Sequence, residues 1–354
     1  MNDDEAMRRA IQVATSARCR TSPNPWVGCV IVTAQGVFDG ATEPPGGRHA
    51  EIVALDATAA AGIDGRGATL YTTLEPCSHQ GRTGPCCEAI IAAGIGRVVS
   101  ALEDPDPLVA GQGHARLTTA GVQVTVGAGA DEVVEQLRPY LHHRRTGRPF
   151  VVLKLAATAD GRTAAADGTS QWITSPEARQ AVHQLRAESD AIVVGAGTVR
   201  ADDPALTVRH LEGSDPRRVV LGHAPPGANV HPCLEWSGPL PDLLDRLGGE
   251  GVLQLMVEGG ASVAHDFHAQ GLVDRYVLHL APALMGGDDG RAMFAGPGAS
   301  TLAELWRGTF RHVERLGPDL VITLDADPTG FDLSRGVSAQ HPTAGDATTN
   351  KEHS

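Results

Sequence analysis

The feature that most constrains this chain is a set of possible metal ligands in two segments, HAE at 49–51 and PCSHQGRTGPCC at 76–87. His49 opens an apolar run with helical character, Cys77 lies in a Pro-Cys turn, and Cys86 opens a second such run. These side chains can meet only if two helices begin beside one turn. Helix N-termini also favour thiolate charge. The sequence therefore predicts two helices that start next to the turn at Cys77.

One imidazole and two thiolates are suitable ligands for zinc, and three protein ligands leave a fourth position for water. Zinc lowers the pKa of such a water towards ~7, which makes hydroxide available at neutral pH. Glu51 would then lie beside the metal as a proton acceptor and donor. Zinc deaminases combine H-x-E with P-C-x-x-C in this way. This chain departs from that pattern, because eight residues separate Cys77 from Cys86.

Cys86 and Cys87 are adjacent, so spacing alone permits either as the third ligand. On a helix their side chains point about 100° apart, and only one can face the metal. We expect Cys87 to pack as a small buried residue. Cys19, Cys29 and Cys233 are interpreted as core or incidental thiols. Six cysteines in 354 residues do not form a disulfide framework, and their clustering favours metal binding.

Helix and strand signals alternate through residues 1–146, which predicts a three-layer α/β/α domain. The expected helices span 4–17, 49–62, 85–96 and 115–121, and the expected strands 27–32, 68–77, 97–104 and 122–127. The basic segment HHRRTGRPF at 142–150 is interpreted as a turn before a new strand at 150–156. We place the domain boundary there.

A second α/β domain is expected over residues 147–328. Its helices are predicted at 175–189 and 261–271, and further strands at 191–196, 217–222, 251–260 and 274–282. The last segment, 329–354, is polar and lacks periodicity, so we expect a disordered tail.

The net charge of −13 disfavours a general nucleic-acid binder, which needs a basic surface. The acidic, amphipathic N-terminus does not resemble a secretory signal. No apolar run approaches the roughly 18 residues that cross a bilayer. We therefore expect a cytoplasmic protein with no nucleic-acid or membrane partner.

The segment TLEPCSHQGRTGPCC, which follows HAE and SPNPWVGCVIV, resembles the deaminase domain of the bifunctional riboflavin-biosynthesis deaminase/reductase family. The second half is similar to the reductase domain of that family. The matching stretches there are 153–179, 193–209, 257–267 and 280–287. The resemblance extends over roughly residues 5–325 in the same order.

This resemblance implies two consecutive reactions, a zinc-dependent hydrolytic deamination of a phosphoribosylated diaminopyrimidinone and an NADPH-dependent reduction of its ribosyl chain to ribityl. It implies a cytidine-deaminase-like domain followed by a dihydrofolate-reductase-like α/β domain. The metal ligands would be His49, Cys77 and Cys86, with Glu51 as the catalytic acid/base. The expected partners are the small phosphorylated pyrimidine and further copies of the chain in a homo-oligomer.

The same resemblance assigns the remaining site residues. Substrate binding is expected at Asn24, His79, Ser170, Arg186, Leu206, Arg209 and Glu258, with Arg82 also near the substrate. Arginine forks suit a phosphate group. Cofactor binding is expected at Ala156, Trp172, Thr198, Asp202, Gly260, Ala261, Ser262, Val263, Ala264, His265 and Asp266. For Lys154 and Asp160, both a substrate role and a structural role are open.

Two glycine-containing segments compete as the phosphate-binding turn. VVGAGTVRAD at 193–202 begins like a dinucleotide fingerprint, but Arg200 stands at the third glycine position. The better candidate is the turn at Gly259 and Gly260, which lets the backbone approach a ligand before the next helix begins. An ordinary strand-to-helix turn is the alternative there.

Two other classes of function are compatible with parts of the pattern. One is a zinc deaminase of a free base, nucleoside or tRNA whose second domain is not catalytic. The other is a structural zinc protein with a binding module, in which Glu51 would have no purpose. The acidic charge, the second domain and the insert between Cys77 and Cys86 favour the bifunctional enzyme.

Overall fold

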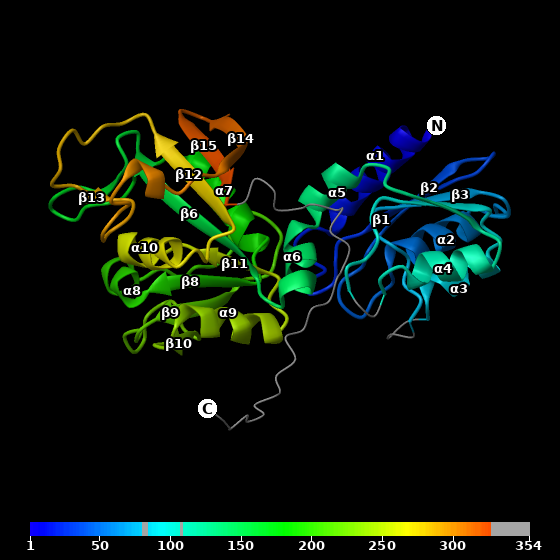
Figure 1. Cartoon of the computed structure of the whole chain (residues 1–354), viewed down its shortest axis with the longest axis horizontal. Coiled ribbons are helices and arrows are strands. Elements are labelled where there is room, and N and C mark those ends of the chain that lie inside the picture. The colour runs from blue at the N-terminus through cyan, green and yellow to red at the C-terminus, as the bar shows by residue number, and fades with distance from the viewer. Residues whose placement is uncertain (80–83, 107–108, 327–354) are drawn as a thin grey trace, which may run out of the picture.

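Two β-sheets, separated along the chain by helix α6 (Arg138–Thr146), form the framework of the protein (Figure 1). The computed structural model describes residues 1–79, 84–106 and 109–326. The expected disordered tail at 329–354 lies outside the described residues. Each sheet with its helices corresponds to one half of the α/β pattern in the sequence.

The first sheet has five strands in the order β2-β1-β3-β4-β5. Their bounds are β1 Gly28–Val32, β2 Val37–Ala41, β3 Thr69–Thr72, β4 Arg97–Ser100 and β5 Gln123–Val126. β1 runs antiparallel to β2 and β3, whereas β3, β4 and β5 are parallel. The carboxyl ends of β3 and β4 therefore lie at the same edge, where the loops that begin after Thr72 and Ser100 follow.

Helices cover both faces of this sheet. They are α1 Asp3–Ala14, the 3-10 turn η1 Thr15–Ala17, α2 Ala50–Ala60, α3 Cys86–Ala92, α4 Gln112–Thr119 and α5 Ala130–Gln136. A Cβ atom on Gly28 would collide with Ala10 of α1, and one on Gly40 would collide with the backbone of α2. Gly40 pairs with Cys29, the neighbour of Gly28, so the two glycines face opposite sides of the sheet. The first half is thus a three-layer α/β/α domain.

The second sheet has eight strands in the order β10-β9-β8-β11-β6-β12-β15-β14. Its strands are β6 Phe150–Thr158, β8 Ala191–Gly195, β9 Arg217–Leu221, β10 Leu234–Trp236, β11 Gln254–Val257, β12 Arg275–Ala281, β14 Thr309–Leu316 and β15 Asp319–Asp325. The strands from β10 to β12 are parallel, and β15 and β14 are added antiparallel. β7 Arg162–Ala164 and β13 Arg291–Ala292 form a separate pair.

Side chains on the two faces of the second sheet belong to different hydrophobic clusters. One face packs against α9 (Leu240–Gly249) and α10 (Ala261–Ala269) through residues such as Leu155 and Val257. The other packs against α7 (Pro176–Ala187) and α8 (Ala196–Asp202) through residues such as Met256. Because side chains alternate along a strand, Lys154, next to Leu155, faces the α7 side.

The interpretation of HHRRTGRPF as a turn was wrong over its first half. Helix α6 continues to Thr146 and ends at Gly147, whose φ of 72° makes it the C-cap. Tertiary contacts hold this polar helix between the two sheets. Tyr140 donates to both Asp104 oxygens at 3.1 Å, and His143 Nε2 lies 3.0 Å from the Gly248 carbonyl.

Several elements carried no expectation from the sequence. These are β2, α5, β7, α8, β10, α9, β13, β14, β15 and the 3-10 turn η2 Leu302–Glu304. β14 (TFRHVERL) is mostly polar and exposed and shows no apolar run, whereas β15 (DLVITLD) contains an apolar run that drew no expectation. Among the described residues, no helix has the length and apolar character that crossing a membrane requires.

Candidate active sites

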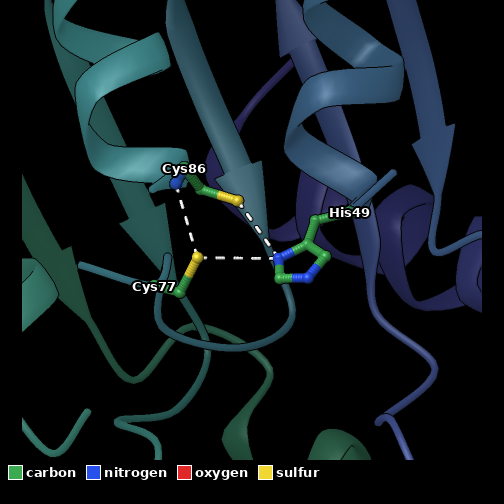
Figure 2. A group of neighbouring side chains, drawn as sticks. All are labelled: His49, Cys77 and Cys86. Carbon is green, nitrogen blue, oxygen red and sulfur yellow. Dashed lines mark hydrogen bonds between the residues drawn. The ribbon is translucent and has the colours of Figure 1, made fainter. Parts of the chain in front are cut away.

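Three possible metal ligands meet where α2 and α3 begin (Figure 2). His49 is the N-cap of α2, Cys86 is the first residue of α3, and Cys77 lies in the loop after β3. His49 Nδ1 lies 3.3 Å from Cys86 Sγ and 3.6 Å from Cys77 Sγ. The Cys86 backbone N–H donates to Cys77 Sγ at 3.4 Å. The sequence set therefore converges on one point.

The geometry of this cluster suits a tetrahedral zinc ion. With zinc–nitrogen and zinc–sulfur bonds of about 2.05 and 2.3 Å, tetrahedral angles place the two ligand atoms about 3.6 Å apart. The two nitrogen–sulfur separations of 3.3 and 3.6 Å are close to that value. One imidazole and two thiols are also the donor set expected of a catalytic zinc with one position left for water. The residues present therefore fit the ion.

The charge distribution supports thiolate character at Cys77. The hydrogen bond from the neighbouring Cys86 thiol, together with the ring of His49, lowers the pKa of Cys77 well below that of a free thiol, although burial opposes this. The hydrogen bond with Cys77 in turn raises the pKa of His49. A deprotonated thiol is the form that binds a metal.

Glu51 lies beside this cluster in the first turn of α2. It is only 4% exposed, and the Cys86 thiol donates to its Oε2 atom at 3.5 Å. Burial, with a smaller contribution from the Cys77 charge, raises the pKa of Glu51 to about 7. A carboxyl group with such a pKa can accept and release a proton near neutral pH.

The other cysteines lie apart from this cluster. Cys87 is fully buried, and its thiol donates to the Pro76 carbonyl at 3.2 Å rather than facing His49. Cys29 is buried in the core of the first sheet. Cys19 and Cys233 are partly exposed.

A second group of possible ligands, Glu75, Glu103 and His114, lies nearby but is built differently. The Glu75 side chain is completely buried, and each of its oxygens accepts two backbone N–H groups. Those four bonds use the lone pairs that a metal would need. We interpret Glu75 as an anchor for the loop that leads into α4.

Two of the residues expected to contact the pyrimidine, Asn24 and His79, lie on loops of the first domain. Asn24 is half-buried in the loop before β1, where its N–H donates to the Thr21 carbonyl at 2.8 Å. His79 is exposed two residues after Cys77. No hydrogen bond between described residues joins either side chain to His49, Cys77 or Cys86. Arg82 lies outside the described residues.

A buried charge cluster marks the second candidate site, on the α7 face of the second sheet. Glu258 follows β11 and receives two hydrogen bonds from Arg186, Nε to Oε2 at 2.9 Å and Nη2 to Oε1 at 3.1 Å. Lys154 of β6 donates to Glu258 Oε1 at 3.3 Å. All three side chains are less than one-fifth exposed. Burial alone would raise the pKa of Glu258, but the charges of Lys154 and Arg186 outweigh it and lower the pKa to about 2.

The Gly259–Gly260 turn lies between this charge cluster and α10. Gly260 is the N-cap of α10, and no side chain caps the helix there. A Cβ atom on Gly260 would lie 3.6 Å from Thr198 Oγ1, so the first turns of α8 and α10 are adjacent. Unpaired N–H groups at such a helix start suit a pyrophosphate. This turn and Thr198 therefore fit the phosphate end of a dinucleotide.

The side chains of residues 260–266 differ in their exposure, so not all of them can contact a cofactor at that turn. Ala261, Val263 and Ala264 are buried, and Val263 and Ala264 pack in the core with α9 and the sheet. Ser262 and Asp266 are exposed, and His265 is half-buried beside Gly296. In this run, only backbone groups and the exposed side chains are free to meet a cofactor.

The other expected residues of the second site are dispersed around the α7 face. Ala156 lies on β6 two residues after Lys154, Asp202 ends α8, and Ser170 and Leu206 lie in loops. Arg209 is exposed near the end of the 203–210 loop. Trp172 is 70% exposed, with the Arg179 guanidinium 4.5 Å from its ring centroid. No single cluster of contacts unites all of them among the described residues.

Reasoning from the sequence missed Glu75 and left the role of Lys154 open. Both interrupt apolar strand segments, FVVLKLA and ATLYTTLEP. A charged residue flanked by core positions requires a buried partner, and that signal could have identified them. Asp160, for which both roles were open, accepts the N–H groups of Met285 and Gly286 and so holds the 284–286 loop.

The ion cluster around Glu258 predicts a dependence of stability on pH. A carboxyl whose pKa is lower in the folded chain stabilises it above the unfolded pKa, and this contribution is lost as pH falls towards the folded pKa. This contribution to the free energy of unfolding is therefore lost between about pH 4.5 and about pH 2. We expect Glu258→Gln to reduce the free energy of unfolding by about 2 kcal/mol at pH 7. That deficit should shrink by about 1 kcal/mol between pH 5 and 3.5.

Urea unfolding at several pH values measures this difference. Glu212→Gln is the matched control, because Glu212 is exposed in the same half of the chain. A deficit for Glu258→Gln that stays constant with pH, or that matches the control, would contradict the ion-pair explanation.

Comparison with known proteins links both sites to described families. A model of the cytidine and deoxycytidylate deaminase zinc-binding region matches residues 1–102, and one of the RibD C-terminal domain matches residues 149–322. The riboflavin biosynthesis protein RibD of Escherichia coli K12 is 39% identical over 368 residues, covering 92% of this chain and 99% of its own length. RibD of Mycobacterium tuberculosis H37Rv is 43% identical over 349 residues, covering 91% and 97%.

The fold comparison gives the same relationship over the whole chain. The crystal structure of a diaminohydroxyphosphoribosylaminopyrimidine deaminase/5-amino-6-(5-phosphoribosylamino)uracil reductase from Thermotoga maritima superposes with a TM-score of 0.84. It is 32% identical and covers 91% of this chain and 98% of its own. Both lobes and their order along the chain are therefore shared with that protein.

Proposed function

The chain belongs to the RibD family of riboflavin-biosynthesis proteins, and we propose that it deaminates and then reduces a phosphoribosylated pyrimidine. As a member of this family it is a bifunctional enzyme with a deaminase and a reductase domain. The proposed substrate is 2,5-diamino-6-(5-phosphoribosylamino)pyrimidin-4-one, and the proposed domains are residues 1–146 and 147–328. The expected homo-oligomer and cytoplasmic location stay predictions.

The arrangement of His49, Cys77, Cys86 and Glu51 carries the deaminase proposal. Zinc, held by the first three residues, would supply a Lewis acid that makes hydroxide available from water at neutral pH. Glu51 accepts the two protons of the water in turn at its carboxylate, and delivers the first to the pyrimidine ring nitrogen and the second to the amino group, which leaves as ammonia. Its burial beside Cys86 keeps the carboxyl out of bulk water, so the proton passes between partners rather than to solvent.

Asn24 and His79 are proposed to orient the pyrimidine. Both lie on loops that flank the ligand cluster in sequence, one before β1 and one after Cys77. An amide side chain can both donate to and accept from the heteroatoms of a pyrimidine. Their role is to place the amino-bearing carbon within reach of Glu51.

The reductase proposal rests on the α7 face of the second sheet. NADPH, when bound, would supply a hydride to the sugar carbon. The Gly260 turn with Ala261 and Ser262 would hold its pyrophosphate through backbone N–H groups, and Thr198, Ala156, Asp202 and Trp172 would border it. Reactive atoms must be ordered and close for hydride transfer, and a sheet edge with two helix starts provides a rigid frame.

Arg186, Arg209 and Glu258 are proposed to bind the substrate of this second step, with Ser170 and Leu206 beside them. Arg186 and Lys154 hold the Glu258 carboxylate in one orientation. That carboxylate can then accept hydrogen bonds from sugar hydroxyls or the base. Arg209 is exposed and has a guanidinium free to meet the phosphate group.

Removal of the metal separates the two activities and tests the proposal. Protein stripped with a chelator should lose deamination of the diaminopyrimidinone phosphate and regain it when Zn²⁺ is added. NADPH oxidation with the already deaminated intermediate should persist, because His49, Cys77 and Cys86 all lie in the first domain. A coupled assay with zinc analysis measures both.

Other outcomes of this assay would contradict the proposal. Deamination by protein shown to be free of metal would remove the zinc role. Turnover of free cytosine or tRNA without turnover of the pyrimidine phosphate would instead favour a base or nucleic-acid deaminase. A zinc content of one per chain with no deamination of any of these would favour a structural zinc protein.

A further inference from the structure

The loop at 203–210, which carries two of the proposed substrate residues, adopts an unusual backbone conformation. Asp203, Leu206 and His210 have φ angles of 41°, 55° and 69°, in the left-handed region that side chains other than glycine rarely adopt. Such conformations persist only when the surroundings hold them in place. The contacts that hold this loop therefore determine where Leu206 and Arg209 lie.

Hydrogen bonds from three other segments fix the loop. The Asp203 carboxylate accepts the Asn229 N–H at 2.8 Å, and Asp215 accepts the Val208 N–H at 2.8 Å. Two further bonds come from α7. Arg186 Nη1 donates to the Thr207 carbonyl, and the Arg209 N–H donates to His183 Nδ1, both at 3.3 Å.

His183 makes two contacts with the end of the loop that bears Arg209. Besides accepting the Arg209 N–H, its ring lies edge-on to the His210 ring, with centroids 5.7 Å apart at 86°. The side chain is 8% exposed, so it is fixed within the structure. Accepting at Nδ1 requires a neutral ring with its proton on Nε2. Burial and the charges of Arg186 and Arg209 lower the pKa of His183, which favours that neutral form.

The position of His183 on α7 connects this loop to the charge cluster. His183 and Arg186 are three residues apart, so they share one face of the helix. Arg186 is bound to Glu258 through two hydrogen bonds and to the loop through a third. One helical turn therefore fixes both ends of the proposed substrate site, Glu258 at one and Arg209 at the other.

We propose that His183 is a positioning residue of the reductase site. Its ring holds Arg209 in the place where the Arg209 guanidinium meets the phosphate group of the substrate. This inference rests on the proposed function of the second domain. Loss of the Nδ1 acceptor frees the Arg209 backbone and weakens binding of the phosphate in the ground state and transition state alike. Such a loss raises KM while kcat is unchanged.

Three substitutions separate this role from a general structural one. His183→Asn keeps an acceptor oxygen near the position of Nδ1. His183→Gln keeps an amide of similar polarity but places it near the position of Nε2. His183→Leu removes the acceptor altogether. The readouts are KM and kcat of reduction for the deaminated phosphate intermediate, for the same compound without its phosphate, and KM for NADPH.

We expect His183→Leu and His183→Gln to raise KM for the phosphorylated intermediate by about tenfold, the usual effect of a lost contact to a charged group. His183→Asn should stay within about twofold of the wild type, and kcat should change little. KM for the dephosphorylated compound and for NADPH should not respond. Deamination, measured on the same preparations, reports that the first domain is folded, and an unchanged kcat of reduction with an unchanged KM for NADPH reports the same for the second.

The inference is overturned if His183→Gln binds the phosphorylated intermediate as well as His183→Asn does. It is equally overturned if KM for the dephosphorylated compound or NADPH rises in parallel. If His183→Leu does not fold, the comparison of His183→Asn with His183→Gln still tests the inference. If the wild type itself does not reduce the intermediate with NADPH, the proposed function fails, which is a distinct result.

Discussion

Glu51→Gln is expected to lower kcat of deamination by about 10²- to 10⁴-fold, the range typical of a lost general acid–base group. Gln has nearly the same shape and can still pack beside Cys86, but it cannot accept and return a proton at neutral pH. The proposed metal ligands His49, Cys77 and Cys86 are unchanged, so zinc content should remain at the wild-type level. Reduction of the deaminated intermediate by NADPH should continue at the wild-type rate.

The control is Glu88→Gln, the same change in the first turn of α3, two residues after Cys86. The Glu88 side chain is half exposed and pairs with Arg116 at the surface, so its loss should leave kcat within about twofold. Normal deamination by Glu51→Gln at normal zinc content would remove the proton-transfer role. Loss of both activities would show that the change damages the whole chain rather than one site.

The convergence of His49, Cys77 and Cys86 could be anticipated because its signals are local. His49 caps a helix, Cys86 begins one, and a Pro-Cys turn precedes the gap between them. Each feature is visible within a few residues, and few folds can join them. The choice between Cys86 and Cys87 was open from spacing, and the direction of the Cys87 thiol towards the Pro76 carbonyl depends on tertiary packing.

The supporting residues of both sites were less accessible to such reasoning. Glu75 binds N–H groups of residues 104–114, and Glu258 pairs with Lys154, 104 positions away in the chain. No short stretch of sequence specifies such a distant partner. A charged residue inside an apolar strand segment does indicate that it has a buried partner, but it does not indicate where in the chain that partner lies.

The same difference applies to the fold: most elements with a local apolar pattern were predicted, and elements that depend on distant contacts were not. The alternating apolar runs of the parallel strands and their helices predicted the two α/β halves. α6 was misinterpreted because its HHRRT segment is polar, and its helical state depends on Asp104, Gly248 and other groups of the two lobes. β14 is exposed along nearly all its length, so it has no apolar alternation to detect.

Glu75→Gln is the substitution with the largest expected effect on stability. Each carboxylate oxygen accepts two backbone N–H groups, those of Gly113 and His114 at one oxygen and of Asp104 and Gly111 at the other. In Gln one of these oxygens becomes an NH₂ group that faces two donors. Two buried N–H groups then lack an acceptor, at about 1–3 kcal/mol each, so the free energy of unfolding should fall by about 2–6 kcal/mol.

The loss should extend to zinc binding, because Pro76 and Cys77 follow Glu75 directly and Gly113 packs against the Pro76 carbonyl. Residues that orient metal ligands typically change metal affinity by about 10- to 100-fold. Urea unfolding and competition with a chelator measure the two effects, and NADPH-dependent reduction at low temperature reports whether the second sheet is intact.

Glu103→Gln provides the matched control for this change. Glu103 belongs to the same group of side chains, but it is exposed, and its substitution should alter stability by no more than about 0.5 kcal/mol. The anchor role predicts that Glu75→Gln is much less stable than Glu103→Gln and binds zinc more weakly. If the two variants unfold at the same urea concentration, the four hydrogen bonds to Glu75 contribute little. If Glu103→Gln alone weakens zinc binding, the ligand set extends beyond His49, Cys77 and Cys86.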